Sequence, residues 1–592
     1  MKRIFFTLFA FLCIVYIFSF ETYTLNMSLS EKNQSKLVYY GDDGKLKYVP
    51  YTEKGDIIPD FSHCGYMGGG VAIPDVRIVS VVFSPNGVDD TSVIQSKIDS
   101  VAKLPLDKSG FRGTILIKKG TYRISSPLKV IASGIVLRGE GNNKENGTVL
   151  LAITPKQYNV IELGIDAKQI PVLSSERNIT DDYVPSGSRI IHVKDAGKTF
   201  KTGDNIIVHR PSTAEWIHAI GMDSIPLRPL KGETTYDSFL RYRKYGEATN
   251  MNGTKQWTEG SRDLLFERTI VSVNDDEIVL NIPLTNALQK EFGGAKIYKY
   301  EFPERISHCG VENMYGMSIF DENVKENNKY IGDYYADEKH ADNFVFCKAV
   351  ENAWVRNVSV EQFDCCVWTS PVAKFITGED LSAVNPVTVI TGGRRYAYSV
   401  WGQMCLFQRC YSSHHRHEFV LGASVAGPNA FVDGHGDMTF ASSEPHQRWA
   451  AGCLYDNITI KGPDGSLLAV DRGWYGSGHG WSGAQIVFWN CSAPVIMVMQ
   501  PPTAQNFAIG SKGRIEDEWN ENSREGTIRA INGVSRSNFK YVGVQSVGDG
   551  WIESADEEVM PHSLYYIQLK NRLGENAIKN IMSKTQINHY LE

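Results

Sequence analysis

The sequence predicts an all-β solenoid, a stack of short strands that repeats along most of the 592 residues. Brief β-rich runs punctuated by glycine, such as "GTILIKKGTYRIS" and "GIVLRGEG", follow one another near the N-terminus. Further along, a polar residue recurs beside each strand at steps of about 23, 29, 48 and 33 residues, and the 48-residue step is interpreted as two coils. The residues taken as equivalent are Asn357, Asp380, Arg409, Asn457 and Asn490.

The first residues predict export. "MKRIFFTLFAFLCIVYIFSF" places Lys2 and Arg3 before a long apolar run, which is typical of a signal peptide over residues 1–22. Because the run is long and lacks a clear cleavage site, an uncleaved anchor is the alternative. No other integral membrane segment is expected, so we predict a location in the periplasm, at the cell surface or outside the cell.

The remaining elements follow in order along the chain. After a tail over 23–74, residues 75–185 are expected to form the first coils, closed by an amphipathic helix at 89–102 with Asp89 or Asp90 as its cap. Longer hairpins over 186–302 predict a small inserted β-domain. The main coils occupy 303–550, and a helix-rich C-terminal cap occupies 551–592.

Composition and cysteine usage set limits on function. The chain has 22% charged and 42% hydrophobic residues, the balance of a folded protein, and a formal net charge of −6. A polyanion partner therefore needs a local basic cleft, and nucleic acid is not an expected partner. Apart from Cys13 in the leader, nine cysteines show no paired spacing and are expected to be mostly buried thiols, with Cys410 and Cys491 at equivalent positions of the repeat.

Several stretches together resemble a known family. "NGVDDTSVIQSKID", "GTILIKKGTYRISSPL" and "GIVLRGEG" resemble the opening of the pectate-lyase-like superfamily, and the later "RRY", "RHEFV", "PHQRW" and "GSGHGW" resemble its bacterial polysaccharide lyases, among them glycosaminoglycan lyases. The resemblance implies a right-handed parallel β-helix. It implies activity less specifically, because the superfamily also contains hydrolases, epimerases and tailspikes.

Histidine, arginine and tryptophan are concentrated in the central loops. Six of the fourteen histidines lie between 414 and 481, where Lys461 is the single lysine. Arginine binds carboxylates and sulfates in a bidentate manner, and indole rings stack on sugars, so this composition favours an acidic polysaccharide.

Cleavage of a uronate polymer by β-elimination needs a group that neutralises the carboxylate, a base and an acid. We assign neutralisation to Arg416 and Arg448, proton abstraction to His417 or His446, and donation to the leaving oxygen to His479 or Tyr475. The further contacts with substrate are assigned to Arg394, Arg395, Arg472, Trp449, Trp481 and His415. Activity is expected to fall as pH drops through the pKa of the base histidine.

Other interpretations remain open for the same residues. A hydrolase would use paired carboxylates, for which Asp433, Asp437, Glu418, Glu444 and Asp471 are available. A binding protein would need no proton-transfer groups, and each motif also has a structural interpretation, such as Trp449 packing as a loop anchor. No cofactor is required, although Asp433 and Asp437 are possible calcium ligands. The preferred substrate is a glycosaminoglycan such as chondroitin or dermatan sulfate, with pectate as the alternative.

Overall fold

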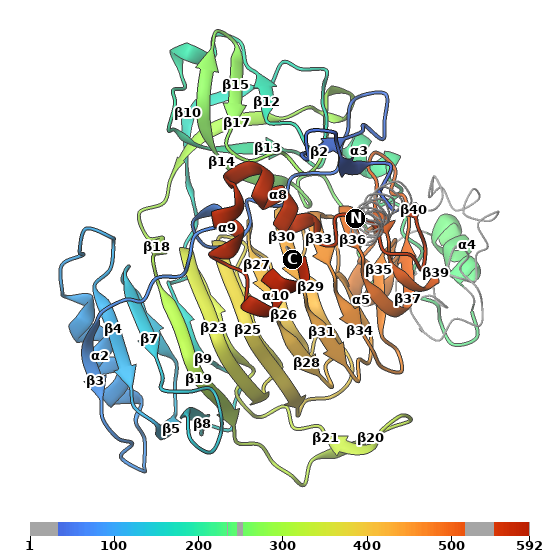
Figure 1. Cartoon of the computed structure of the whole chain (residues 1–592). Helices are drawn as coiled ribbons and strands as arrows, with labels where there is room; N and C mark the ends of the chain where they lie inside the picture. The colour runs from blue at the N-terminus through green and yellow to red at the C-terminus, as the bar shows by residue number, and fades with distance from the viewer. Residues whose placement is uncertain (1–32, 234, 246–252, 516–549, 591–592) are drawn as a thin grey trace, which may run out of the picture.

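The chain folds into a right-handed parallel β-helix with an inserted β-domain on one side (Figure 1). The computed structural model describes residues 33–233, 235–245, 253–515 and 550–590. The predicted signal peptide at 1–22 lies outside the described residues, and export stays a prediction. No described helix combines the length and apolarity needed to cross a membrane.

Three parallel sheets form the walls of the solenoid. The first sheet pairs, in order, β3 (Ile78–Val82), β4 (Gly113–Ile117), β7 (Ile135–Arg138), β19 (Gly310–Ser318), β23 (Val350–Gln362), β25 (Lys374–Pro386), β27 (Leu406–Gln408), β30 (Ala426–Val432), β33 (Ala450–Asp456), β36 (Gly483–Trp489), β38 (Phe507–Ile509) and β40 (Trp551–Glu553).

The second sheet contains β5 (Gly120–Ile124), β8 (Thr148–Ala152), the far halves of β19, β23 and β25, then β28 (Tyr411–Ser413), β31 (His435–Asp437), β34 (Thr459–Ile460), the start of β37 (Ser492–Val498) and β39 (Lys512–Ile515).

The third sheet contains β6 (Leu128–Val130), β9 (Asn159–Leu163), β22 (Asn343–Cys347), β24 (Cys365–Thr369), β26 (Tyr396–Val400), β29 (His417–Leu421), β32 (Ser442–Pro445), β35 (Ser466–Ala469) and the end of β37.

The polar repeat predicted from the sequence marks one corner of the coils between β23 and β37. All five residues adopt the left-handed backbone, with φ between 50° and 55°: Asn357, Asp380, Arg409, Asn457 and Asn490. Asp433, at φ 51°, lies midway in the 48-residue step, so this step is two coils, as predicted. Asparagine and aspartate tolerate this conformation better than other side chains, which explains why the corner keeps them.

Apolar side chains fill the space between the three sheets. One continuous buried cluster runs from the first coils to Ala508, and removal of this surface from water is the main stabilising term. The nine described cysteines are all buried and free, and several of them belong to this cluster. They therefore act as small apolar residues, as predicted.

Helix α2 (Thr91–Ala102) closes the N-terminal end of the stack (Figure 1). Its buried residues Ile94, Ile98 and Val101 pack against the first coils. The helix starts at Thr91 rather than at 89, since the Asp89 carboxylate accepts a hydrogen bond from the Thr91 amide at 3.0 Å outside the first turn.

The inserted β-domain starts at Ile170, earlier than the predicted 186. Its antiparallel sheet has the order β10 (Ile170–Asn178), β17 (Lys296–Glu301), β13 (Asn205–Arg210), β14 (Leu264–Asn274), β15 (Glu277–Leu280) and β12 (Ile190–His192). An antiparallel bridge between Ile179 and Val193 brings the two edges together. The short helices α3 (Ala214–Ala219) and α4 (Thr235–Tyr245) and the pair β11 (Tyr183–Val184) and β16 (Leu288–Gln289) complete it.

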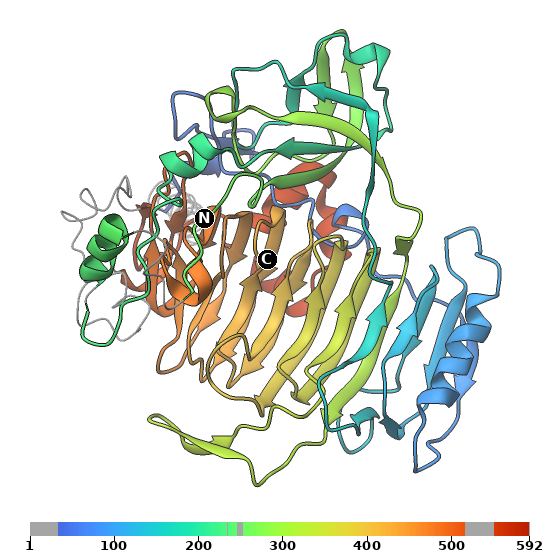
Figure 2. The same ribbon diagram turned by 180° about the vertical axis from the view of Figure 1, so that it is seen from behind.

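Buried charges and apolar packing join the insert to the coils. Glu267 of β14 is almost fully buried and pairs with Arg305 at 2.5 Å and with Lys374 of β25 at 3.1 Å. A second apolar cluster combines insert residues such as Trp216 with coil residues such as Trp449. Figure 2 shows the insert from behind, seated along one edge of the stack.

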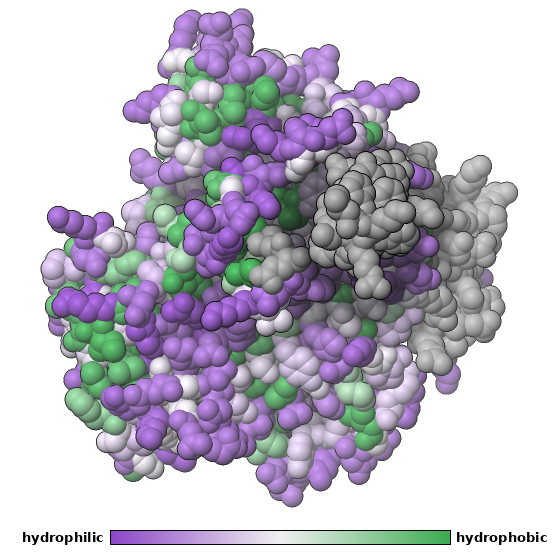
Figure 3. Space-filling view, in the orientation of Figure 1, coloured by the Kyte–Doolittle hydropathy of each residue, from purple (hydrophilic) through white to green (hydrophobic). Residues whose placement is uncertain are grey.

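The C-terminal helices cover a side of the solenoid rather than its end, which corrects the predicted cap. Helices α8 (Leu564–Leu573), α9 (Glu575–Lys579) and α10 (Lys584–Tyr590) lie over the outer face of the first sheet, in front of β27 and β30 in Figure 1. The described part of the tail packs with them, including β1 (Val38–Tyr40) and β2 (Leu46–Tyr48). Seen from this side the surface is a mosaic in which hydrophilic residues predominate (Figure 3).

Candidate functional site

A cleft of about 650 Å³ lies on the outer side of the third sheet. Strands β24, β26 and β29 form its floor, where Val420 faces the cleft between the core residues Phe419 and Leu421. The loops that follow β25, β32 and β35 form its walls, and the insert adds Arg228. The polar and aromatic residues that line it are Arg228, Trp368, Thr391, Tyr396, Ser399, Trp401, Arg416, His446, Gln447, Arg472, Tyr475 and His479.

A chain of polar contacts runs from the cleft into the protein. The Tyr396 hydroxyl lies 3.2 Å from His446 Nε2, and His446 Nδ1 lies 2.9 Å from Glu444 Oε1. Arg472 Nη1 donates to Glu444 Oε1 at 2.5 Å and to the His446 carbonyl at 2.7 Å. Arg472 Nη1 carries two hydrogens, and these two bonds use both of them. It therefore has no hydrogen left for His446 Nδ1, which lies 2.9 Å away, and Nδ1 donates its own hydrogen to Glu444 Oε1. His446 Nε2 is therefore an acceptor that faces Tyr396.

His417 lies directly beneath this chain. Its ring centre is 4.8 Å from that of His446 and 4.9 Å from that of Tyr396, and its side chain is 1% exposed. Its Nδ1 donates to the Ser442 carbonyl at 2.5 Å, which leaves Nε2 unprotonated and without a partner in the described structure. His417 does not line the cleft, so its geometry suits positioning of the two rings above it.

The loop that carries Tyr475 and His479 forms one wall of the cleft. The His479 ring lies 5.1 Å from the His446 ring. Gly476 adopts φ 56°, and a Cβ there would come within 2.1 Å of the His479 ring, so the close approach of loop and ring requires glycine. α5 (Tyr475–Gly478), which has two non-helical residues, is the only regular element of this loop.

Residues of the insert hold this loop in place. Arg228 Nη2 donates to the Gly476 carbonyl at 2.9 Å, and the Lys255 amide donates to the Ser477 carbonyl at 3.1 Å. The indole of Trp257 donates to the Gly478 carbonyl at 3.3 Å. The cleft is therefore built jointly by the coils and the insert.

The arginines near the cleft differ in how far they are already paired. Arg472 is committed to Glu444. Arg416 donates to the Gly392 carbonyl and Arg448 to Ser477 Oγ, and in the described part of the chain no carboxylate lies within 4.0 Å of either. Uncommitted guanidinium groups beside an open cleft are suited to bind an anionic ligand. Arg448 is not among the lining residues, but its charge acts on His446.

Burial and cationic neighbours keep the three imidazoles neutral. Burial lowers the pKa of His446 and of His417 well below 6.5, and nearby Arg416 and Arg472 lower both further. Burial and Arg472 likewise lower the pKa of His479. Burial raises the pKa of Tyr396, and Arg416 opposes part of that shift. At neutral pH the cleft therefore presents unprotonated imidazole beside a protonated phenol.

The prediction that Trp449, Trp481 and His415 contact the substrate is wrong. Trp449, Trp481 and His415 are each 0% exposed. The insert covers both indoles, whose N–H groups donate to Asn286 Oδ1 and to the Ile220 carbonyl. A fully buried ring cannot stack on a sugar, and the structural alternative for Trp449 is the one observed.

Two arginines predicted to bind anions have other roles. Arg395 is 2% exposed and donates to the carbonyls of Thr388, His414 and Tyr335, so it braces loops. Arg394 pairs with Glu338 at 2.8 Å and does not line the cleft. Neither guanidinium is placed to bind a ligand in the cleft.

Sequence reasoning missed part of the cleft. Trp368 and Trp401 stack on each other with ring centres 6.2 Å apart and line the floor of the cleft. They offer the aromatic surface for sugar stacking that the sequence had assigned to Trp449 and Trp481. Tyr396, at the end of "RRY", carries no spacing signal of its own. The contribution of Arg228 could be found only from the tertiary packing.

The predicted calcium ligands do not converge. Asp433 accepts hydrogen bonds from Gln586 and Tyr590 of α10, and Asp437 pairs with His435 at 3.0 Å. The described residues bring His417, Glu444 and His446 within metal-binding distance of one another. Arg472 Nη1 already donates to Glu444 Oε1, so a metal ion at this oxygen would compete with the guanidinium.

Comparisons with known proteins identify no family. No protein-family model matches the chain, and no curated protein matches it. Among solved structures it is similar to the tailspike protein gp49 from Pseudomonas phage LKA1, with 12% identity, TM-score 0.39, and coverage of 72% of this chain and 64% of that chain. The tailspike of E. coli bacteriophage HK620, solved with a pentasaccharide, gives 11% identity, TM-score 0.34, and coverage of 81% and 62%.

Endo-xylogalacturonan hydrolase from Aspergillus tubingensis gives 9% identity, TM-score 0.30, and coverage of 74% of this chain and 90% of that chain. The chain aligns with less than two thirds of the length of each of the two tailspikes. The parallel β-helix itself follows from the strand pairing described above.

Proposed function

We propose that the protein cleaves a uronate-containing acidic polysaccharide by β-elimination in this cleft. One observation carries the proposal: among the described residues that line the cleft there are three arginines, two histidines and two tyrosines, but no aspartate or glutamate. Hydrolysis uses two carboxyl groups on either side of the scissile bond. Glu444 is fully buried and bonded to Arg472 and His446, so it cannot serve as one of them.

The cleft residues can perform each step of the elimination. Arg416 pairs with the uronate carboxylate and stabilises the negative charge that develops when C5 loses its proton. The Tyr396 oxygen takes that proton while its own proton passes to His446 Nε2, and Glu444 stabilises the resulting imidazolium. The C4–O4 bond then breaks, C4 and C5 become doubly bonded, and the Tyr475 hydroxyl protonates the departing oxygen. His479, the other predicted donor, is neutral because burial and Arg472 lower its pKa, so it is not suited to this role.

We favour a glycosaminoglycan such as chondroitin or dermatan sulfate as the substrate. Arg228 and Arg416 line the cleft and Arg448 lies behind it, which is more positive charge than one carboxylate per sugar requires. Trp368 and Trp401 provide the flat surface on which a sugar ring can stack. Pectate is the alternative, because it needs only one carboxylate contact per residue.

Incubation with chondroitin sulfate, dermatan sulfate and polygalacturonate tests the reaction class. Elimination produces a C4–C5 unsaturated uronate, so the expected result is an increase in ultraviolet absorbance together with new reducing ends. New reducing ends without absorbance would mean hydrolysis. Binding without either product would mean a non-catalytic protein, and turnover of polygalacturonate alone would exclude the glycosaminoglycan assignment.

The pH dependence provides a separate prediction. The proton acceptor works in its unprotonated form, and the pKa of His446 is well below 6.5. We therefore expect kcat/KM to stay constant as pH falls to 6.5 and to decrease only at lower pH. Replacing Arg448 with methionine removes one of the charges that lower this pKa, so the acid limb should move to higher pH. An acid limb centred at or above pH 6.5 in the wild-type protein would contradict this assignment.

A further inference from the structure

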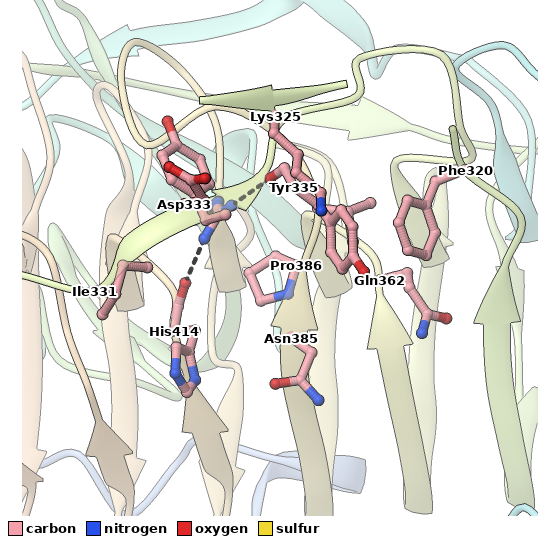
Figure 4. Close-up of a pocket in the computed structure, with 12 residues that line it drawn as sticks. Phe320, Lys325, Ile331, Asp333, Tyr335, Gln362, Asn385, Pro386 and His414 are labelled. Atoms are coloured by element: carbon pink, nitrogen blue, oxygen red, sulfur yellow. Dashed lines mark hydrogen bonds between the residues drawn. The ribbon is translucent and has the colours of Figure 1, made fainter. Parts of the chain in front are cut away.

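A second pocket, of about 420 Å³, lies under the hairpin of β20 (Lys325–Asn328) and β21 (Gly332–Tyr335) (Figure 4). The hairpin projects from the coils and is held at both ends. The Tyr330 hydroxyl donates to Asp464 at 2.7 Å, and the Ile390 amide donates to the Tyr334 hydroxyl at 3.2 Å. Arg395 supports the hairpin from below through the Tyr335 carbonyl at 3.3 Å. The pocket is therefore shaped by contacts within the chain itself.

Polar side chains with spare hydrogen-bonding capacity line the coil side of this pocket. Gln362 and Asn385 end neighbouring strands, and the register of β25 with β28 places His414 level with Asn385 on the next coil. Within the described part of the chain Asn385 makes no side-chain hydrogen bond, and Gln362 uses only its oxygen, at 3.4 Å from the Ser318 amide. Successive coils lie roughly 4.8 Å apart, so these groups form a short ladder of donors and acceptors.

An aromatic ring faces this ladder. Tyr335 hangs from the hairpin beside Phe320, with ring centres 4.8 Å apart, and is 37% exposed (Figure 4). The Lys325 ammonium lies 5.3 Å from the Tyr335 ring and makes no ion pair within the described structure. A flat ring opposite amide groups is the arrangement that binds a sugar, by stacking on its apolar face and hydrogen bonds to its hydroxyls.

The pocket adjoins the cleft across one loop. Arg395 and His414 line the pocket, whereas the next residue, Tyr396, and the next but one, Arg416, line the cleft. Two residues of extended chain span about 7 Å, which is comparable to one or two sugar units. A polymer in the cleft can therefore continue over the 387–395 loop into the pocket.

We propose that this pocket is a second saccharide-binding site, which holds a sugar unit of the same polysaccharide away from the reacting bond. The link to cleavage rests on the proposed function, but the binding of sugar does not. The lining favours a sugar with free hydroxyl or amide groups over a multiply charged one, because Arg395 is committed to carbonyls and Lys325 is the one cation left.

Affinity electrophoresis in gels that contain chondroitin sulfate, dermatan sulfate or polygalacturonate tests the site. We expect at least one polymer to retard the wild-type protein, and the Tyr335→Ala variant to bind it about fivefold to tenfold more weakly, the loss of one stacking contact. The matched control is Tyr411→Ala, since Tyr411 is also 37% exposed but lines neither pocket. A second variant, Asn385→Asp, keeps the backbone preference and should also weaken retardation.

The outcomes separate this proposal from the proposed function. If a polymer is cleaved, Tyr335→Ala should raise KM for the long chain and leave turnover of its tetrasaccharide unchanged. If no polymer is cleaved but retardation depends on Tyr335, the second site stands and the lyase assignment fails. Equal retardation of wild type and Tyr335→Ala, or no retardation by any of the three polymers, overturns the second site.

Discussion

Replacing Tyr396 with phenylalanine or His446 with alanine is expected to lower kcat by at least about a hundredfold on the best substrate. Each change removes one member of the pair through which the C5 proton passes, joined at 3.2 Å. Because the two residues act as a unit, the double variant should be little slower than either single one. Initial rates of unsaturated product, measured on protein shown to be folded by circular dichroism, provide the readout.

The control for this experiment is Tyr411→Phe, which removes a tyrosine hydroxyl from the second sheet, away from the cleft, and should leave kcat unchanged. His417→Ala should have a smaller effect than His446→Ala, because His417 supports the pair from beneath without lining the cleft. Near-normal rates in both Tyr396→Phe and His446→Ala would place the chemistry elsewhere.

The second large effect concerns stability. Arg472→Met should lower the free energy of unfolding by about 3 to 5 kcal/mol, the usual result of leaving a buried charge without its partner. The Arg472 side chain is 4% exposed and Glu444 0%, and their atoms meet at 2.5 Å. Chemical denaturation followed by tryptophan fluorescence measures the loss.

A double variant distinguishes this cause from simple loss of packing. Adding Glu444→Gln to Arg472→Met removes the stranded charge, so the double variant should be more stable than Arg472→Met alone. Arg394→Met is the surface control: Arg394 is 40% exposed in its pair with Glu338 and should change stability by less than about 1 kcal/mol. Equal stability of Arg472→Met and the wild type would show that the Arg472–Glu444 pair makes no net contribution to the free energy of unfolding.

The coil repeat was predictable from sequence because its corners impose a local rule. Asn357, Asp380, Asn457 and Asn490 stand where the backbone turns left-handed, and the same residue types recur there for that reason. Asp433 lies inside the 48-residue step, and the sequence alone did not identify it as a corner residue. Its equivalence to the other corner residues is seen only in the stacked coils. The start of the insert at Ile170 was missed, since β10 reads like one more strand of the ladder.

The candidate site was predictable in its loops and less so in its individual residues. The density of histidine and arginine indicated the right segments, and the structure brings Arg416, His446 and His479 to one cleft. Which side chains are exposed depends on contacts between distant segments. The insert packs against Trp449 and Trp481 and contributes to their burial, and no local pattern encodes that contact.

Because the coils and the insert build the cleft together, substitutions in the coils and substitutions in the insert have different consequences for the cleft. Tyr396, His446 and Glu444 belong to the coils, where stacking on both sides restricts substitution. The loop with Tyr475 and His479 is held by Arg228, Lys255 and Trp257 of the insert, outside the repeat. Variation in the insert can therefore reshape the cleft wall, and with it the range of accepted sugars, while the Tyr396–His446 pair stays untouched. Altering the insert is accordingly a route to new specificities that leaves the groups that remove the proton unchanged.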